Sequence, residues 1–593
     1  MTARDRSRHR GPGVPAGRMM ASEQQSVLDP GVPEVPGAPE VPDVPVGPGP
    51  AAPRPTAAGR LRAALRARRR WLVPLLVVLL LAQMAAAMVT TAVEQTPTID
   101  EPVYVATATD YLHEHRLRYN PEHPPLGKLF VMAGIAVADP HYDPSYRGDQ
   151  GEVGRHLLYA SGNDPWRMMF WARLPVIVLT LLFGLVAFAF AREILGRTAG
   201  LPALALYCFS PDLIAHGSLA TLDVPSAGFV LTSAWLVWRA RRRPRLYLPL
   251  AGAALGAAVA TKMNALPAIP VLVALAVTAV WGGRSRRLPR VLTAAAVVAL
   301  TAVAVVWLSY LAVDPRLRFQ ATVPIPAIHG ARGLLVDLMP FPQAYRDGMR
   351  LQFGLEDYPW QGYLFGHLYT GSRWYYLPAA LLVKTPLGML VLWAAGAAAL
   401  VAVRRLRPAA PYVLLPPAVL LASAMTGSRD FGTRYALFMP MFLAVGGASV
   451  LALRRRWVRP VGGALALFVA VSSLRAFPFY LPYSNEAFGG PAKTHLRLHD
   501  SNVDWGQDLG RLADRLKERY PGERIWLVYK GSGIPAYYGI HAADPRKVPP
   551  GRVHGLLVVS DSSVAKARGR LAELIDSSRP VDDVGHSITI YRR

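Results

Sequence analysis

The chain has 593 residues, of which 52% are hydrophobic and 18% charged, and 65 Lys and Arg against 39 Asp and Glu give it a formal net charge of +26. The apolar residues come in long blocks, which excludes both a largely disordered chain and an ordinary water-soluble enzyme. The single cysteine, Cys208, lies in an apolar stretch, which excludes disulfides and cysteine-based metal sites. Such an excess of positive charge suits either nucleic acid or basic loops on one face of a membrane, and the positions of the charges decide between them.

The N-terminal part of the chain has two contrasting segments. Residues 1–59 repeat PEVP- and PDVP-like units without apolar periodicity, so we expect a disordered, Pro-rich cytoplasmic tail. A cluster of arginines at residues 60–70 then precedes a stretch without any charge at residues 71–93. As a helix, that stretch would be about 34 Å long, which is enough to cross a bilayer.

Ten further apolar blocks follow, which predicts about 11 membrane spans in all. The blocks lie at residues 174–191, 198–210, 222–238, 246–261, 265–281, 291–313, 376–403, 411–425, 435–453 and 460–476. If the N-terminus is cytoplasmic, every dense basic cluster after the first span falls on the cytoplasmic side. These clusters lie at residues 192–197, 239–245, 284–290, 404–407 and 454–459. Membrane topology therefore accounts for the basic charge, and we expect no nucleic-acid partner.

The outer face should receive two long loops, residues 94–173 and 314–375, and a C-terminal tail. We predict a mainly α-helical, polytopic transmembrane domain over residues 60–476, followed by a small extracytoplasmic α/β domain over residues 477–593. In this tail Asp504 is expected to cap a helix with an apolar stripe, and three β-rich runs follow it. The stripe is Trp505, Leu509, Leu512 and Leu516, and the runs are residues 525–529, 556–559 and 587–591.

The first outer loop carries the densest candidate chemistry. Asp100 and Glu101 are adjacent acids just beyond the first span, and the apolar spacing after Pro102 predicts a helix along the membrane surface. A second apolar element at residues 124–138 is too short to span and contains a solitary Lys128. Taken singly, Asp100 could be a helix cap and Lys128 a snorkelling anchor. Together, an acid and a cation at the bilayer surface suit a reaction on a phosphate-bearing lipid.

Several motifs carry a family resemblance. The DE pair followed by HPPLGK (residues 123–128) resembles the first loop of protein O-mannosyltransferases, in the GT-C superfamily of glycosyltransferases that use lipid-phosphate-linked sugars. Further stretches are similar to members of this group, the last three of them to bacterial membrane enzymes. They are SPDLIAHGSLATLDVP (residues 210–225), WYYLPAALLVKTPL (374–387), GTRYALFMP (432–440) and DSNVDWGQDL (500–509).

This resemblance implies an inverting glycosyltransferase with a polyprenyl-phosphate sugar donor, mannose being the favoured sugar. An acid in the first outer loop would act as general base on an acceptor hydroxyl, and the match gives that role to Asp100, with Glu101 as the weaker candidate. Cations would hold the donor phosphate. The candidates are Lys128, Arg173, Lys262 and Arg434, where interface anchoring is the alternative for Arg173 and Arg434. His123 and Asp223 are expected to position substrate, with helix capping as the alternative for Asp223.

Other kinds of site are less well supported. No His/Asp cluster with metal-ligand spacing accompanies Asp100, so no cofactor or divalent metal is indicated. The stretch from Asp500 fails as an EF-hand because Trp505 and Arg511 occupy the positions that need Gly and Glu, so we expect it to form a turn and a helix cap without a catalytic role. The sequence also contains no Walker phosphate loop and no G-x-S-x-G elbow.

Two alternatives to the enzyme remain open from the sequence. A secondary transporter or lipid flippase would also have many interrupted spans, although its ionisable groups usually lie near the bilayer midplane. A catalytically inactive membrane scaffold would use its outer tail to bind partners. The predicted enzyme is a multi-pass cell-membrane protein with a cytoplasmic N-terminus and an extracytoplasmic C-terminal domain. Its acceptor would be a protein, a lipid or a glycan.

Overall fold

The computed structural model describes residues 57–281, 288–453 and 455–593, and it describes side chains from residue 71 onwards. Most of the predicted tail at residues 1–59, and the basic residues at 284–287 and 454, therefore lie outside the described residues. Residues 57–59 already belong to the first helix. Contacts divide the chain into two units, residues 1–66 and 67–593, and every interaction reported below lies within the second.

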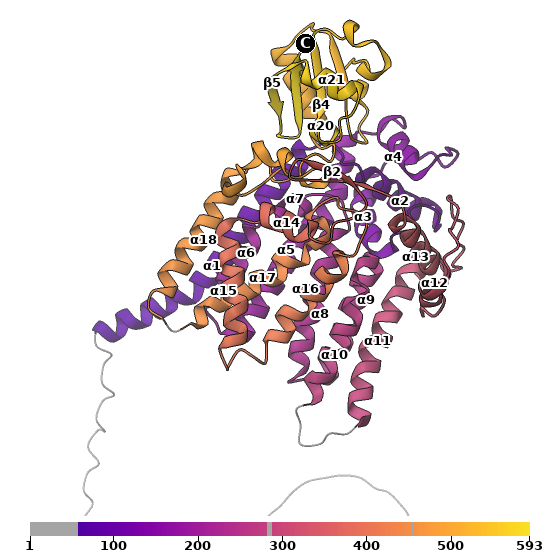
Figure 1. Cartoon of the computed structure of the whole chain (residues 1–593). Coiled ribbons are helices and arrows are strands. Elements are labelled where there is room, and N and C mark those ends of the chain that lie inside the picture. The colour runs from indigo at the N-terminus through magenta and orange to yellow at the C-terminus, as the bar shows by residue number, and fades with distance from the viewer. Residues whose placement is uncertain (1–56, 282–287, 454) are drawn as a thin grey trace, which may run out of the picture. The chain divides into compact units, whose positions relative to one another are not determined.

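Helices make up most of the described chain (Figure 1). The first half contains α1 (Ala57–Glu94), α2 (Glu101–Glu114), α3 (Pro125–Ala138), α4 (Gln150–Tyr159), α5 (Pro165–Leu195), α6 (Gly200–Cys208), α7 (Pro211–Gly217), α8 (Asp223–Ala240), α9 (Pro244–Thr261), η1 (Met263–Ala265), α10 (Ala268–Trp281) and α11 (Leu288–Leu311). The second half contains α12 (Gly330–Asp337), α13 (Gln343–Glu356), α14 (Tyr376–Lys384), α15 (Leu387–Ala402), α16 (Ala410–Ala424), η2 (Thr433–Ala436), α17 (Phe438–Gly447), η3 (Ala448–Ala452) and α18 (Val458–Arg475). A short hairpin, β1 (Gln361–Leu364) and β2 (His367–Thr370), lies in the second long loop.

The membrane character predicted from the apolar blocks is confirmed. Among the described residues, 5 helices are long and apolar enough to cross a membrane, or up to 6 if the bent pair α14–α15 counts as one span. They are Trp71–Glu94, Pro165–Leu195, Met263–Trp281, Leu288–Leu311 and Val458–Arg475. All of the predicted blocks contain helix, but several of these helices are shorter than a span, so the number of spans stays a prediction.

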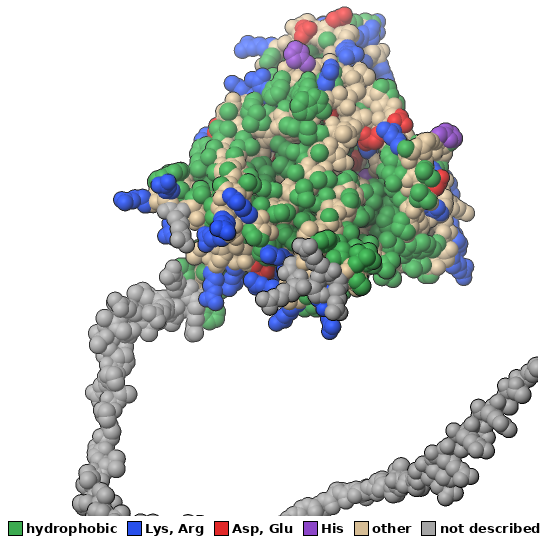
Figure 2. Space-filling view, turned by 60° about the horizontal axis from the view of Figure 1, so that its bottom comes forward, with side chains coloured by type: hydrophobic (Ala, Val, Ile, Leu, Met, Phe, Trp, Pro, Cys, Tyr) green, Lys and Arg blue, Asp and Glu red, His purple; other side chains and the backbone are tan. Residues whose placement is uncertain are grey.

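A broad apolar surface covers the helical part of the molecule, with Lys and Arg side chains gathered towards its lower rim (Figure 2). Large side chains that would be buried in a soluble protein are exposed on these helices, among them Leu182, Leu292, Leu300 and Leu467. An exposed apolar surface of this extent is stable in contact with lipid and unstable in water. The surface therefore agrees with a protein embedded in a bilayer.

Antiparallel helices return several separate parts of the chain to one end of the bundle. Helix α8 begins with Asp223, and after the turn at residues 241–243 helix α9 runs back to Thr261. The side chains of Asp223 and Lys262 consequently meet at this end, while the arginines of the turn lie at the other. Figure 1 shows α2, α3 and α4 and the C-terminal sheet at one end of the bundle, and the bond from the Ala220 N–H to Glu101 of α2 places the start of α8 at that end. This end, called the site end below, thus collects the first loop and the chain's final residues.

One helix pair is sharply broken. Helices α14 and α15 meet at an angle of 119°, at Thr385 and Pro386. Such a break frees backbone carbonyl groups that a continuous helix would use. The side-chain amide of Asn485 donates to the carbonyl oxygens of Leu382 (2.7 Å) and Thr385 (2.8 Å), and its backbone N–H donates to that of Val383 (2.9 Å). One asparagine from the segment after α18 therefore satisfies the broken turn.

The C-terminal region, residues 509–593, is a small α/β layer. Its sheet has the order β3-β4-β6-β5, with β3 parallel to β4 and the other pairs antiparallel. The elements are α19 (Leu509–Arg519), β3 (Ile525–Val528), β4 (Leu556–Ser560), α20 (Asp561–Ala565), α21 (Arg570–Asp576), β5 (Arg579–Val584) and β6 (Ile588–Arg592). The α/β class and three predicted strands are confirmed, whereas β5 was missed because its half-exposed RPVDDV sequence has no apolar alternation.

The predicted helix in this region begins later than expected. Helix α19 starts at Leu509, and Leu509, Leu512 and Leu516 are buried along it as the stripe predicted. Trp505 lies before the helix, and the Asp504 carboxylate accepts from the Gly506 N–H (3.1 Å) in a turn instead of capping α19. The prediction of a cap at Asp504 was therefore wrong, because a turn of four residues separates it from the helix.

The C-terminal region should also respond to pH. Burial is the main cause that raises the pKa of Asp561 to about 7, although the Thr589 hydroxyl donates to its Oδ1 (2.7 Å). The folded protein then binds this proton more tightly than the unfolded chain, whose carboxyl group titrates near 3.8, so the free energy of unfolding should decrease as pH rises from about 4 to about 7. Asp561→Asn keeps an acceptor for Thr589 but carries no charge.

We predict that Asp561→Asn raises the thermal midpoint at pH 8 by about 2–4 °C, the shift expected from about 1 kcal/mol, and raises it clearly less at pH 4.5. Thermal unfolding in detergent, followed by intrinsic fluorescence at both pH values, measures this difference. Asp576→Asn, at an exposed position of α21, is the matched control and should not change the pH dependence. An equal shift at both pH values for Asp561→Asn would contradict the prediction.

Candidate active site

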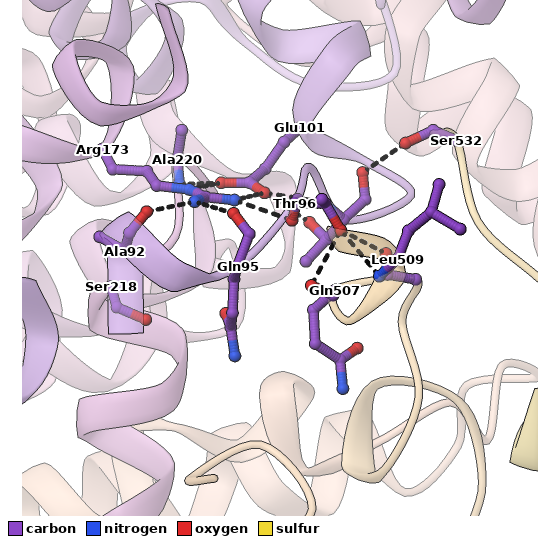
Figure 3. A network of polar contacts seen from close by, with 12 residues as sticks. Ala92, Gln95, Thr96, Glu101, Arg173, Ser218, Ala220, Gln507, Leu509 and Ser532 are labelled. Carbon is purple, nitrogen blue, oxygen red and sulfur yellow. Dashed lines mark hydrogen bonds and ion pairs between the residues drawn. The ribbon is translucent and has the colours of Figure 1, made fainter. Parts of the chain in front are cut away.

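A fully buried ion pair lies directly beneath the first loop. Glu101, the first residue of α2, and Arg173, in α5, have no exposed surface, and their closest charged atoms are 2.7 Å apart. Figure 3 shows the guanidinium group between the Glu101 carboxylate and the carbonyl groups at the end of α1. Arg173 donates to Glu101 through Nε and Nη2, to the carbonyl oxygens of Ala92 (2.7 Å) and Gln95 (2.8 Å) through Nη1, and to that of Thr96 (3.2 Å) through Nη2.

The Glu101 carboxylate also accepts hydrogen bonds from Ala220 and Thr98. Its Oε1 accepts from the backbone N–H of Ala220 (2.8 Å), and its Oε2 accepts from the N–H (2.8 Å) and the hydroxyl (3.0 Å) of Thr98. Burial alone would raise the pKa of Glu101, but the charge and hydrogen bonds of Arg173, with the backbone N–H groups of Thr98 and Ala220, lower it below its usual value. Glu101 and Arg173 are therefore held as an ionised, fully hydrogen-bonded anchor, without N–H groups or oxygens left for a substrate.

Asp100 faces a different partner and keeps access to solvent. Its side chain is 28% exposed, and its Oδ2 accepts from Arg434 Nη1 at 2.6 Å. It precedes α2 but makes no side-chain cap hydrogen bond to that helix, so capping does not explain its position. Within the described part of the chain, Asp100 Oδ1 has no hydrogen-bond partner in the protein. Two adjacent acids are thus separated into a sealed one and an accessible one.

The cation that meets Asp100 is itself enclosed by aromatic rings. The Arg434 guanidinium carbon lies 4.5 Å from the ring centre of Trp505 and 5.0 Å from that of Tyr435, distances at which a cation is attracted to an aromatic face. The Tyr435 ring is also 5.4 Å from Lys262 Nζ, and Lys262 pairs with Asp223 at 2.5 Å. Tyr435 thus lies between two ion pairs, Asp100–Arg434 and Asp223–Lys262.

A pocket opens beside these two pairs. Its polar wall is formed by Asp223, Asn264, Arg434 and Tyr435, and its apolar wall by side chains of α8, α16 and the start of α17. The apolar residues are Val230, Leu420, Leu437 and Phe438. Among the described residues, Asp223 Oδ2 and Arg434 Nε are buried without a hydrogen-bond partner. An unmatched acceptor and an unmatched donor beside one pocket are suited to a polar ligand.

Lys128 and His123 are placed differently from the pocket residues. Lys128 has no exposed surface, and its Nζ donates to the carbonyl oxygens of Asn120 (2.8 Å) and His123 (2.7 Å) and to the Asn120 side-chain oxygen (3.3 Å). Its three donors are therefore used to hold the turn before α3, and it does not snorkel. Burial first, and then the charges of Lys262 and other nearby cations, lower the pKa of His123 well below its usual value, which keeps its ring neutral.

The structure thus brings Asp100, Asp223, Lys262 and Arg434 together and places Glu101, Arg173 and Lys128 in the supporting interior. Sequence reasoning missed three residues around the pocket, namely Tyr435, Asn264 and Trp505. Tyr435 and Trp505 lie inside motifs already identified by resemblance, GTRYALFMP and DSNVDWGQDL, and Asn264 follows Lys262 by two positions. A second missed pair, Lys384 and Asp212 (3.4 Å), is buried nearby between α14 and α7.

Comparison with known families identifies the class of enzyme. Residues 77–316 match the family described as dolichyl-phosphate-mannose-protein mannosyltransferase. No curated protein sequence matches the chain. The family match confirms the resemblance carried by the first loop: residues 77–316, less than half of the chain, are those of a membrane glycosyltransferase.

Solved structures give distant likenesses. ArnT from Cupriavidus metallidurans in the apo state is 16% identical, with a TM-score of 0.46, over 88% of this chain and 98% of its own. The Archaeoglobus fulgidus oligosaccharyltransferase in the apo form is 14% identical, with a TM-score of 0.42, over 75% of this chain and 58% of its own. The S. cerevisiae Pmt1-Pmt2 complex bound to the sugar donor is 18% identical, with a TM-score of 0.32, over 41% of this chain and 33% of its own.

The buried anchor generates a stability prediction. Arg173→Met would leave Glu101 buried without its counter-charge and three backbone carbonyl groups without donors, which should cost about 3–5 kcal/mol of unfolding free energy. Arg173→Lys keeps the charge but has three donors in place of five, so it should be destabilised less. Denaturant unfolding in detergent, with the yield of folded protein, measures both changes.

Arg167→Met supplies the control for this series, because Arg167 is exposed on the same helix. It should change the unfolding free energy by less than about 0.5 kcal/mol, as surface substitutions usually do. If Arg173→Met were as stable as Arg167→Met, the anchor would not have the energetic role that its geometry indicates.

Proposed function

Because residues 77–316 form a domain of the dolichyl-phosphate-mannose-protein mannosyltransferase family, we propose that this glycosyltransferase moves mannose from a polyprenyl phosphate to a hydroxyl group on the extracytoplasmic face of the membrane. The observation that carries the proposal is the contrast between Asp100 and Glu101. An acid that is to accept a proton from a substrate needs an oxygen that a substrate can reach. Asp100 has one, whereas both oxygens of Glu101 are saturated by protein donors.

In the proposed reaction Asp100 is the general base. Its carboxylate takes the proton of the acceptor hydroxyl while that oxygen forms a bond to the anomeric carbon of the sugar. The bond from the anomeric carbon to the phosphate oxygen breaks, its electron pair leaves with the polyprenyl phosphate, and the configuration at the anomeric carbon inverts. The proton then passes from Asp100 to water. A single carboxylate is sufficient for such an inverting transfer, so Glu101 needs no direct part in it.

Arg434 and Lys262 are the proposed partners of the donor phosphate. The Arg434 side chain lines the pocket, and Lys262 contacts Asp223 and Tyr435, which also line it. Developing charge on a leaving phosphate is stabilised by cations held in place before the reaction. Arg173 and Lys128 were also predicted for this role, but all their donors are used inside the protein. In the proposal they support the loop and the turn that surround the site.

The pocket walls suit the two chemical halves of the donor. The polar wall with Asp223 and Asn264 would face the sugar hydroxyls, which can both donate and accept hydrogen bonds. The apolar wall would face the first isoprene units of the lipid. His123, whose ring lies 5.9 Å from that of Tyr104, stays beside the first loop and would act on substrate only through that loop.

The sidedness of the reaction rests on the distribution of arginines. The short turns at residues 241–243 and 403–409 carry arginines at the end of the bundle opposite the site end. Positively charged loops are retained on the cytoplasmic side, so the site end would face outwards together with the C-terminal region. An acceptor there would be a protein, a lipid or a glycan hydroxyl.

The experiment is transfer from defined donors by the purified protein. We predict that the protein labels a component of a membrane extract with mannose from radiolabelled polyprenyl-phosphate mannose, in preference to glucose or an amino sugar on the same lipid. Asp100→Asn should lower the rate by about 10²- to 10⁴-fold, the usual contribution of a general base, while donor binding persists. Asp357→Asn is the control, since Asp357 is also paired with an arginine (2.9 Å) but is 62% exposed.

Each outcome separates the candidate classes. Transport of the lipid donor without sugar transfer, or a rate that Asp100→Asn leaves unchanged, would contradict the proposed enzyme and its base. Preference for another sugar would retain the enzyme and replace mannose as its substrate. Identification of the labelled component gives the acceptor class directly.

A further inference from the structure

The segment before helix α19 lies against the loop that carries Asp100. The backbone N–H of Thr96 donates to the carbonyl oxygen of Gln507 (2.9 Å), and that of Ile99 donates to the carbonyl oxygen of Trp505 (3.0 Å). The Thr96 hydroxyl also donates to Gln507 O (2.9 Å) and accepts from the N–H of Leu509 (3.2 Å), as seen in Figure 3. The loop immediately before the base is therefore held by residues more than 400 positions later in the chain.

A second contact to the same loop comes from the turn after β3. The hydroxyl of Ser532 donates to the carbonyl oxygen of Thr98 (2.8 Å), also drawn in Figure 3. Thr98 in turn donates to Glu101 of the buried anchor. Thr96, Thr98 and Ile99 thus each contact the C-terminal part of the chain, while the anchor holds the loop from the other side.

Trp505 contacts Arg434 and the residue that directly precedes Asp100. Its carbonyl oxygen binds the N–H of Ile99, the residue directly before Asp100, and its ring lies 4.5 Å from the Arg434 guanidinium carbon. The side chain is only 1% exposed, so it has little freedom to move. A shift of Trp505 would therefore displace the base and the cation together.

Trp505 is itself fixed by the C-terminal region. Its N–H donates to the side-chain oxygen of Gln507 (2.7 Å), and the carboxylate of Asp504 accepts from the N–H of Ser562 (3.2 Å) in α20. Gly506 adopts φ +86°, and a Cβ there would lie 2.7 Å from the Cα of Gly531, so the turn requires glycine. The turn at Gly506 and the bond from α20 to Asp504 therefore hold Trp505 in place.

We propose that the C-terminal α/β region is a positioning device for the catalytic base, and that Trp505 and Ser532 are the positioning residues through which it acts. The proposal rests on the function proposed for Asp100. A general base and its partner cation must be held to a fraction of an ångström, and a misplacement of about 1 Å can cost about 10²-fold in rate. Without these contacts the loop would depend on the anchor alone.

The first test compares two buried tryptophans. Trp505→Leu removes the ring beneath Arg434, and Trp505→Phe keeps an aromatic face there. Trp526→Leu is the matched control, because Trp526 is also 1% exposed and lies beneath an arginine, Arg524, at 4.6 Å, but within the sheet. We expect Trp505→Leu to lower kcat by about 10- to 100-fold with the KM for polyprenyl-phosphate mannose changed less than threefold, and Trp505→Phe to restore most of kcat.

A milder variant covers the case in which Trp505→Leu does not fold. Ser532→Ala removes one hydroxyl bond to the loop, and Ser578→Ala removes a comparable bond (2.6 Å to Leu574 O) within the C-terminal region. Hydrogen exchange of the peptide containing residues 95–99 provides a readout independent of activity. Exchange in this peptide should accelerate at least tenfold in Trp505→Leu and Ser532→Ala, and stay unchanged in Trp526→Leu and Ser578→Ala.

The results distinguish the two proposals. Unchanged exchange in both loop-contact variants, or equal loss of kcat in Trp505→Leu and Trp526→Leu, would overturn the positioning role. A loss confined to KM, or a Trp505→Phe variant as slow as Trp505→Leu, would overturn it as well. Accelerated exchange in a protein that transfers no sugar from any lipid donor would support the positioning contacts and reject the proposed function.

Discussion

The buried contact between Glu101 and Arg173 is the constraint on which the site depends. Charges taken out of water are tolerated only when they are paired and hydrogen-bonded, and this pair meets that requirement by recruiting the carbonyl groups at the end of α1. The position of the first loop is therefore tied to α5 by the same bonds that make the charges tolerable. Since Asp100 precedes Glu101 in the chain, its direction follows from the anchor.

The anchor also explains why adjacent acids have different properties. At the start of α2, consecutive side chains point in different directions, so the Glu101 carboxylate faces the interior and the Asp100 carboxylate faces Arg434. The interior acid is saturated by five donors, and the outer one has a single arginine partner. The fully bonded acid stabilises the loop, whereas the acid with one partner keeps an oxygen that is not bonded to a protein donor. The adjacent residues Asp100 and Glu101 thus provide one acid of each kind.

Much of this arrangement could be predicted from the sequence, but the assignment of the cations could not. Uncharged stretches predicted the helices, and the position of the DE pair after the first span predicted the loop in which the candidate base lies. A lysine or arginine near a helix end gives the same signal whether its N–H groups face a ligand or the backbone, so Lys128 and Arg173 could not be distinguished from Lys262 and Arg434. Only the surrounding carbonyl groups, which come from distant residues, separate the two cases.

Trp505 and β5 illustrate two other limits. The contact of Trp505 with the first loop joins segments about 400 residues apart, and periodicity within a local window contains no information about such pairing. Strand β5 is exposed over its first half and carries two adjacent aspartates, so the alternation that indicates a strand is absent although the backbone bonds are present. Polar edge strands and long-range backbone pairing were for this reason found only in the three-dimensional structure.

The break between α14 and α15 has a consequence for how the chain after α18 is attached. Asn485 supplies the hydrogen bonds that the interrupted helix lacks, so the segment after α18 is hydrogen-bonded to the bend between α14 and α15. Lys384, the last residue of α14, donates to the carbonyl oxygens of Leu481 and Asn502, which precede and follow Asn485 in the chain. Any tilt of α14 would consequently pull on the chain that leads to Trp505, which gives the broken helix a mechanical connection to the site end.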